Sequence, residues 1–157
     1  KPSSAASDVY KRQGFNNVLD LALKLPPEDA VYFVEGDYLH RPGAAQILIE
    51  GLELGADYVT LYDHPDKYFD GGNPLIEGDG EITKVYLTKS CHWKLTNSTT
   101  LTFAATVKTL KRDESILRKW TKPAHANDFE LLMSMLNDRP SVAPLVLKKT
   151  HCLCACH

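Results

Sequence analysis

Two carboxylates separated by one glycine, Glu35 and Asp37, directly follow an apolar run at residues 30–34. Such a run of small and β-forming residues is typical of a strand that is buried on both faces. Open α/β sheets bind ligands at the carboxyl ends of their strands, where these two carboxylates would lie. Carboxylate oxygens suit a hard divalent cation that is shared with a phosphorylated substrate. Gly36 would let the backbone turn toward such a ligand; the simpler interpretation is an acidic turn that merely ends a strand.

The segments around these carboxylates alternate between helix and strand. Helical spacing of apolar residues predicts a helix over 14–25, ended by two prolines, and another over 42–54, ended by a glycine. A second strand is predicted over 57–63. This order predicts an α/β fold with a mixed, mainly parallel sheet flanked by helices. We expect strands 30–34 and 57–63 to be parallel neighbours, with the 42–54 helix packed across them.

The second half of the chain has a different pattern. Residues 64–80 are rich in Gly, Pro and Asp and predict a long loop, either a binding loop or a disordered segment. The elements predicted after it are two strands that alternate as an antiparallel pair would, 82–87 and 99–107, helices over 113–120 and 128–136, and a strand over 142–147.

Composition bounds the class of protein. The chain has 157 residues, 43% of them apolar and 24% charged, which fits one soluble globular domain. A net charge of −2 offers no electrostatic basis for binding nucleic acid, so no nucleic-acid partner is expected. No apolar run is long enough for a transmembrane segment, and no signal peptide is visible.

The two ends differ in character from the middle of the chain. Residues 1–13 lack apolar periodicity and are interpreted as a non-native or disordered leader, with the native protein beginning near Gly14 and an upstream part lost. The single domain is expected over 14–151. The cysteine-rich residues 152–157 are interpreted as a disordered or mistranslated tail, because their spacing is not that of a zinc finger.

Taken in order, these features resemble the second half of a GT-A-fold glycosyltransferase of the family 2 type. The resemblance covers roughly residues 14–151 and rests on the buried strand with Val34-Glu35-Gly36-Asp37-Tyr38, the Pro42-led helix, Leu54-Gly55-Ala56-Asp57 with its strand, Trp93, the Thr/Ser-rich strand, Asn127-Asp128 and Thr150-His151. It implies a partial GT-A fold without the N-terminal nucleotide-binding strands. It also implies a metal-dependent enzyme that transfers a sugar from a nucleotide-diphospho-sugar donor to a carbohydrate or other hydroxyl acceptor, with inversion, and a fragment that is inactive alone.

The resemblance assigns roles to the acidic residues. Glu35 and Asp37 would bind the metal, Mn²⁺ or Mg²⁺, and with Gly36 they would bind the donor. Gly36 departs from the family, in which a second Asp often occupies the middle position. Asp128 matches the carboxylate that serves as catalytic base and removes a proton from the acceptor hydroxyl. Its alternative role is a helix N-cap, which Asp commonly fills.

Further residues match the acceptor side and the late metal position. Thr88, Ser90, Trp93 and Asn127 would bind the acceptor, since an aromatic ring and hydroxyls suit the apolar face and polar rim of a sugar. His151 would complete the metal or diphosphate contacts. The simpler interpretations are a tryptophan that belongs to the core and a histidine that is only exposed.

Two other function classes stay open. One is a divalent-metal phosphodiesterase built on Glu35 and Asp37, which would need further clustered carboxylates or histidines. The other is a non-catalytic carbohydrate-binding or interaction domain, which Gly36 favours. The expected location is cytoplasmic, peripheral to the membrane in the full-length parent protein.

Overall fold

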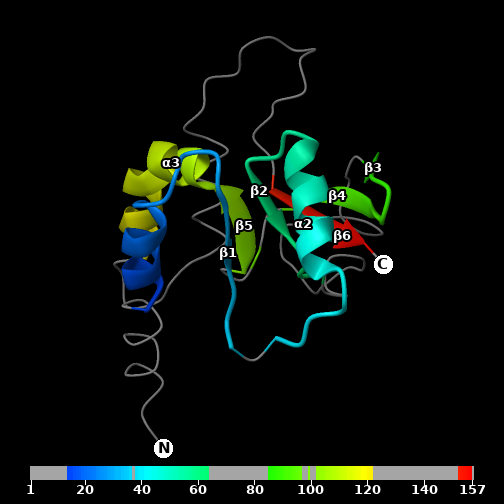
Figure 1. The fold of residues 1–157 in the computed structure, drawn as a ribbon, viewed down its shortest axis with the longest axis horizontal. Helices are drawn as coiled ribbons and strands as arrows, with labels where there is room; N and C mark the ends of the chain where they lie inside the picture. Colours follow the sequence, from blue (N-terminus) through cyan, green and yellow to red (C-terminus); the bar gives the residue numbers. More distant parts are fainter. Residues whose placement is uncertain are drawn as a thin grey trace, which may run out of the picture.

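The computed structural model of the protein describes residues 14–36, 38–63, 85–96, 99, 102–121 and 152–156. After a helical segment at residues 14–22, the elements are β1 (Ala30–Phe33), α2 (Ala44–Glu53), β2 (Tyr58–Thr60), β3 (Val85–Leu87), β4 (His92–Thr96), β5 (Phe103–Thr106), α3 (Val107–Trp120) and β6 (Cys152–Cys156) (Figure 1). The loop predicted at 64–80, the helix at 128–136 and the strand at 142–147 lie outside the described residues.

The strands form one six-stranded sheet in the order β1-β5-β2-β6-β4-β3. β5 is antiparallel to both β1 and β2, β4 is antiparallel to both β6 and β3, and β2 and β6 are parallel. The described sheet is therefore mainly antiparallel, so the prediction of a mainly parallel sheet, and with it the expected partial GT-A fold, is wrong. The order of helices and strands along the chain does not specify which strands pair, and a late strand can insert between two early ones.

The pairing of β5 shows that two predictions about neighbouring strands are wrong. Its Phe103 pairs with Phe33 of β1 and its Ala104 pairs with Val59 of β2, so β5 separates the two strands that were expected to be neighbours. β5 was also expected to pair with the strand that contains β3, whereas β3 pairs with β4. Phe103, Ala104 and Ala105 are all buried, because β5 is covered on both faces.

Helices cover both faces of the sheet, and side chains alternate between them. Phe33, Tyr58, Phe103 and Ala105 face the 14–22 helix and α3, where they form one core cluster with Phe15, Leu19, Ala22, Leu110 and Leu117. Val59, Trp93 and Ala104 face α2, where they pack with Leu48. Figure 1 shows the 14–22 helix beside α3 at one end of the sheet and α2 across its middle.

The helix ends follow local signals. Gly55 has a φ of 83° directly after α2, which confirms the predicted end of that helix. α3 begins at Val107, earlier than the predicted 113, because Thr106 caps it by accepting a hydrogen bond from the Thr109 amide, 3.2 Å.

Two strands occupy segments for which no strand was predicted. β4 occupies residues that were expected to form an acceptor-binding connection. β6 occupies residues 152–156, which were expected to form a tail, and it lies between β2 and β4 in the sheet. The pairing of β6 with β4 joins strands β4 and β3 to strands β1, β5 and β2.

Candidate functional site

The acidic segment after β1 forms a turn. The Tyr38 amide donates to the Glu35 carbonyl, 3.4 Å, so the chain reverses here instead of continuing in an extended conformation. Glu35 is half-buried at this turn. Gly36 does not use the left-handed conformation, and no heavy atom lies within 4 Å of where its Cβ would be. The turn therefore does not depend on glycine, and position 36 has room for a larger residue.

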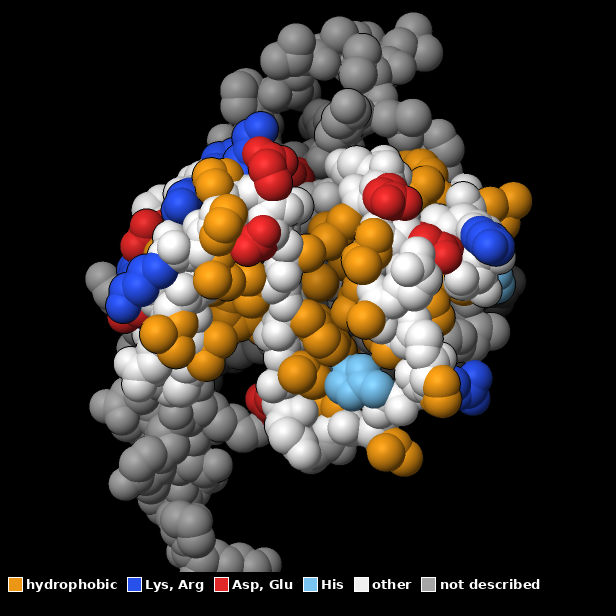
Figure 2. All heavy atoms as spheres, viewed as in Figure 1, with side chains coloured by type: hydrophobic (Ala, Val, Ile, Leu, Met, Phe, Trp, Pro, Cys, Tyr) orange, Lys and Arg blue, Asp and Glu red, His pale blue; other side chains and the backbone are white. Residues whose placement is uncertain are grey.

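A cavity of about 500 Å³ opens beside this turn, between β1 and α2. Its volume lies within the range usual for small-ligand sites. Figure 2 shows it as a hollow lined by apolar side chains, with one imidazole at its end. The lining residues are Ala30, Val31, Tyr32, Val34, His40, Ala44, Ala45, Leu48, Ile49, Leu52 and Ala104. We call this cavity the β1–α2 cleft.

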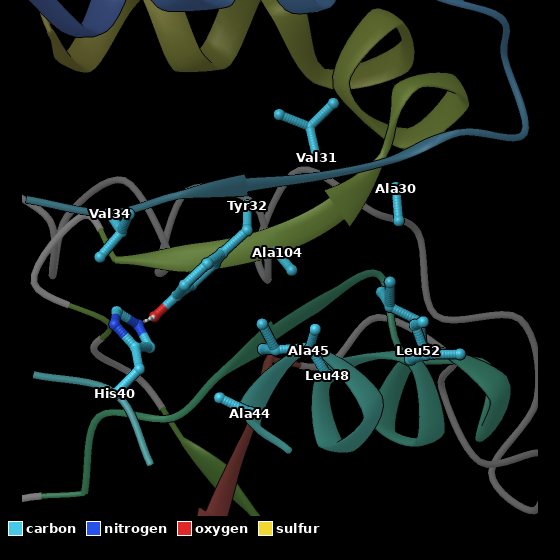
Figure 3. Close-up of a pocket in the computed structure, with 11 residues that line it drawn as sticks. Ala30, Val31, Tyr32, Val34, His40, Ala44, Ala45, Leu48, Leu52 and Ala104 are labelled. Atoms are coloured by element: carbon cyan, nitrogen blue, oxygen red, sulfur yellow. Dashed lines mark hydrogen bonds between the residues drawn. The ribbon is translucent and has the colours of Figure 1, made fainter. Parts of the chain in front are cut away.

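Two side chains supply the polar groups of the β1–α2 cleft. Tyr32 extends from β1 toward His40, and Tyr32 Oη and His40 Nε2 share a hydrogen bond of 3.0 Å (Figure 3). The two rings meet edge to face with centroids 5.4 Å apart. Burial raises the pKa of Tyr32, and the nearby Tyr38 raises it further. This pair gives an otherwise apolar site one place for a hydrogen-bonding ligand group.

The predicted metal site depends on the carboxylates of the turn after β1. Among the described residues, no group of three or more His, Cys, Asp or Glu side chains is arranged to hold a metal ion. Glu35 is the one predicted metal ligand in the described part of the chain, since Asp37 and His151 lie outside it. A single carboxylate does not make a Mg²⁺ or Mn²⁺ site, although such sites usually bind through only one or two carboxylates plus substrate phosphates.

Ser90 and Thr88 of the predicted acceptor site hold the β3–β4 connection to other parts of the fold. The Ser90 amide and hydroxyl donate to the Glu50 carboxylate, 3.0 and 2.8 Å. The hydrogen bond from the Ser90 side chain lowers the pKa of Glu50, and this lowering outweighs an opposing effect of burial. Thr88 Oγ1 donates to the Cys91 carbonyl, 3.0 Å, and accepts from Trp93 Nε1, 3.2 Å. These contacts tie the connection to α2 and to β4.

Trp93 is a core residue in this structure. Its side chain is 0% exposed, so it presents no surface to a bound sugar. β4 is also four strands away from β1 in the sheet, roughly 19 Å at the usual spacing of strands. The structure therefore does not bring Thr88, Ser90 and Trp93 together with the acidic turn. Asn127 and Asp128 lie outside the described residues, and their roles stay predictions.

Sequence reasoning missed the role of Tyr32 and His40. Strand alternation was the available signal, because it places Tyr32 on the same face as Ala30 and Val34. No local pattern indicates that the chain after the turn brings His40 back to Tyr32, because that contact depends on the path of the loop.

Searches against protein-family models, curated proteins and solved structures found no match for this chain. In the part of the chain that the structure describes, none of the helices has the length and apolar character needed to cross a membrane. The turn after β1 and the neighbouring cleft, together with the order of the sequence motifs, form the basis for a functional assignment.

Proposed function

We propose that this chain binds a nucleotide-diphospho-sugar through the turn after β1 and takes part in transferring its sugar to an acceptor hydroxyl. One observation carries the proposal: the turn that holds Glu35 borders the β1–α2 cleft, since Val34 before it and His40 after it both line the cavity. A donor in this position would have its diphosphate beside the turn carboxylates. That juxtaposition requires a divalent cation, because carboxylates and phosphates otherwise repel one another.

The roles proposed for individual residues follow the motif order. Glu35 and Asp37 would hold Mn²⁺ or Mg²⁺, which, when bound, offsets the charge of the leaving diphosphate. Asp128 would remove the proton of the acceptor hydroxyl as that oxygen attacks the sugar. The acceptor would be a carbohydrate or another hydroxyl compound. We place the reaction in the cytoplasm.

Calorimetric binding tests the proposal. The full chain is titrated with UDP-glucose and with GDP-mannose, with and without Mn²⁺. We expect Mn²⁺-dependent binding of one donor, and at least a tenfold weaker affinity in Glu35→Gln and in Asp37→Asn. Glu53→Gln, an exposed acid on α2, is the matched control and should bind as the unmodified chain does. Absence of binding, or equal affinity in all four proteins, contradicts the proposal.

A second candidate is a non-catalytic interaction domain. The apolar character of the β1–α2 cleft favours such a domain, because Tyr32 and His40 are the only polar side chains among the residues that line it. Such a domain would bind an apolar partner without Mn²⁺ and would not bind nucleotide-sugars. The phosphodiesterase alternative is tested in the same samples by Mn²⁺-dependent hydrolysis of bis(p-nitrophenyl) phosphate, which the glycosyltransferase proposal predicts to be absent.

A further inference from the structure

β1 lies at the edge of the sheet, although its sequence is that of a central strand. Among the described residues it pairs with β5 on one side, and it ends the strand order. Its residues Ala30–Phe33 and the following Val34 include no charge and no proline. Edge strands of soluble proteins commonly carry charged residues or proline, because an edge without them tends to pair with other chains. The described edge of β1 therefore lacks the charges and prolines that usually prevent a further strand from pairing.

The β1–α2 cleft adds an apolar surface beside this edge. Val34 and Ile49 line it, and each is 44% exposed. Figure 2 shows the apolar lining open to the viewer along the length of the hollow. A strand added to β1 would send alternate side chains toward this surface. The strand that fits has apolar residues at alternate positions.

The charged residues that flank β1 limit which strand could pair with it. Glu28 and Asp29 precede β1 and Glu35 follows it, so both ends of the edge are acidic. Two β1 strands paired antiparallel would bring these acids together, which is unfavourable. The strand that fits therefore has basic residues at its ends.

β3, at the opposite edge of the same sheet, has this chemistry. Val85 and Leu87 occupy alternate positions and are 56% and 77% exposed. Lys89 follows β3 and is exposed, and Lys84 precedes β3 in the sequence. Among the strands that the structure describes, β3 ends the order on its side, as β1 does on the other. The two edges of one molecule are thus complementary in charge and apolar character.

We propose that a second copy of this chain docks its β3 edge antiparallel against β1. The strand pairings make β1 and β3 run in the same direction within one molecule. A copy that is turned over so that its β3 runs antiparallel to β1 therefore brings Val85 and Leu87 to the cleft side, where they would compete with a donor bound in the β1–α2 cleft. The same arrangement places Lys89 near Glu28 and Asp29. Because the two surfaces differ, the contact is heterologous and produces open-ended assemblies.

Sedimentation velocity of the full chain over a range of concentrations tests this contact. We expect association that increases with concentration and weakens at high salt, because exposed charges are screened. Val34→Lys blocks the β1 surface and Leu87→Lys blocks the β3 surface, and each should raise the dissociation constant at least tenfold. Val18→Lys, at a position 45% exposed on the 14–22 helix, is the matched control and should associate like the unmodified chain.

Mixing the two blocked variants is the decisive experiment. Val34→Lys keeps an intact β3 edge and Leu87→Lys keeps an intact β1 edge, so an equimolar mixture should form a capped dimer although each variant alone is monomeric. Unchanged circular dichroism confirms that both variants are folded. A monomeric unmodified chain, or a mixture that stays monomeric, overturns the proposal. Association abolished by Val34→Lys but unaffected by Leu87→Lys also overturns it, because another surface then occupies the cleft.

Discussion

Replacing Asp113 by alanine removes the acceptor of a buried hydrogen-bond cluster between β2 and α3. Asp113 is 3% exposed and accepts from Tyr58 Oη at 2.8 Å. It also accepts from Arg112 Nε and Nη2, 2.9 and 2.7 Å, and Arg112 Nη1 contacts Asp57 at 2.8 Å. The cluster joins residues 55 positions apart in the sequence, so its loss should weaken the packing of α3 on the sheet.

The expected loss of unfolding free energy is about 2 kcal/mol. A buried Tyr58 hydroxyl that loses its acceptor costs about 1–3 kcal/mol. Arg112 contributes little, because its side chain is 46% exposed and keeps Asp57 as a partner. The better helix propensity of alanine returns roughly half a kcal/mol.

Urea denaturation followed by circular dichroism measures this loss. With a slope of about 2 kcal/mol per molar urea, the midpoint should fall by about 1 M. Glu114→Ala, which removes a half-exposed acid from the next position of α3, is the control and should cost less than about 0.5 kcal/mol. Tyr58→Phe should cost less in the Asp113→Ala background than in the unmodified chain. Equal midpoints for Asp113→Ala and Glu114→Ala would refute the reasoning.

Three further predictions concern single positions. Burial, reinforced by Asp113, raises the pKa of Tyr58, so the stability that its neutral form contributes should fall as the pH rises above the unfolded value of about 10. Denaturation of Tyr58→Phe should lack this part of the alkaline loss. Gly51→Ala should lower the urea midpoint, because its Cβ would lie 2.7 Å from the buried Trp93 ring, whereas Gly14→Ala, with no atom within 4 Å, should not. Gly36→Asp should fold normally and tighten calorimetric Mn²⁺ binding, since position 36 has room for the side chain; unchanged affinity would count against the metal site.

Local patterns in the sequence were sufficient for several elements near the candidate site. The apolar run at 30–34 predicted β1, although β1 ends the order of the described strands and is not buried on both faces as expected. The glycine that ends α2 was predicted because only a residue tolerant of positive φ suits that position. The turn after β1 was also predictable, since its acidic and glycine residues are typical of turns. These features depend on neighbours within a few residues.

Tertiary structure alone decided the order of the strands and the shape of the site. β5 lies between β1 and β2, where Phe103 and Ala104 bury their side chains on opposite faces of the sheet. β6, which follows all the other strands in the sequence, lies between β2 and β4. The contact of Tyr32 with His40 and the burial of Trp93 likewise depend on long-range packing. Periodicity specifies which side of a strand is apolar, but the partner that covers it is selected by packing between residues far apart in sequence.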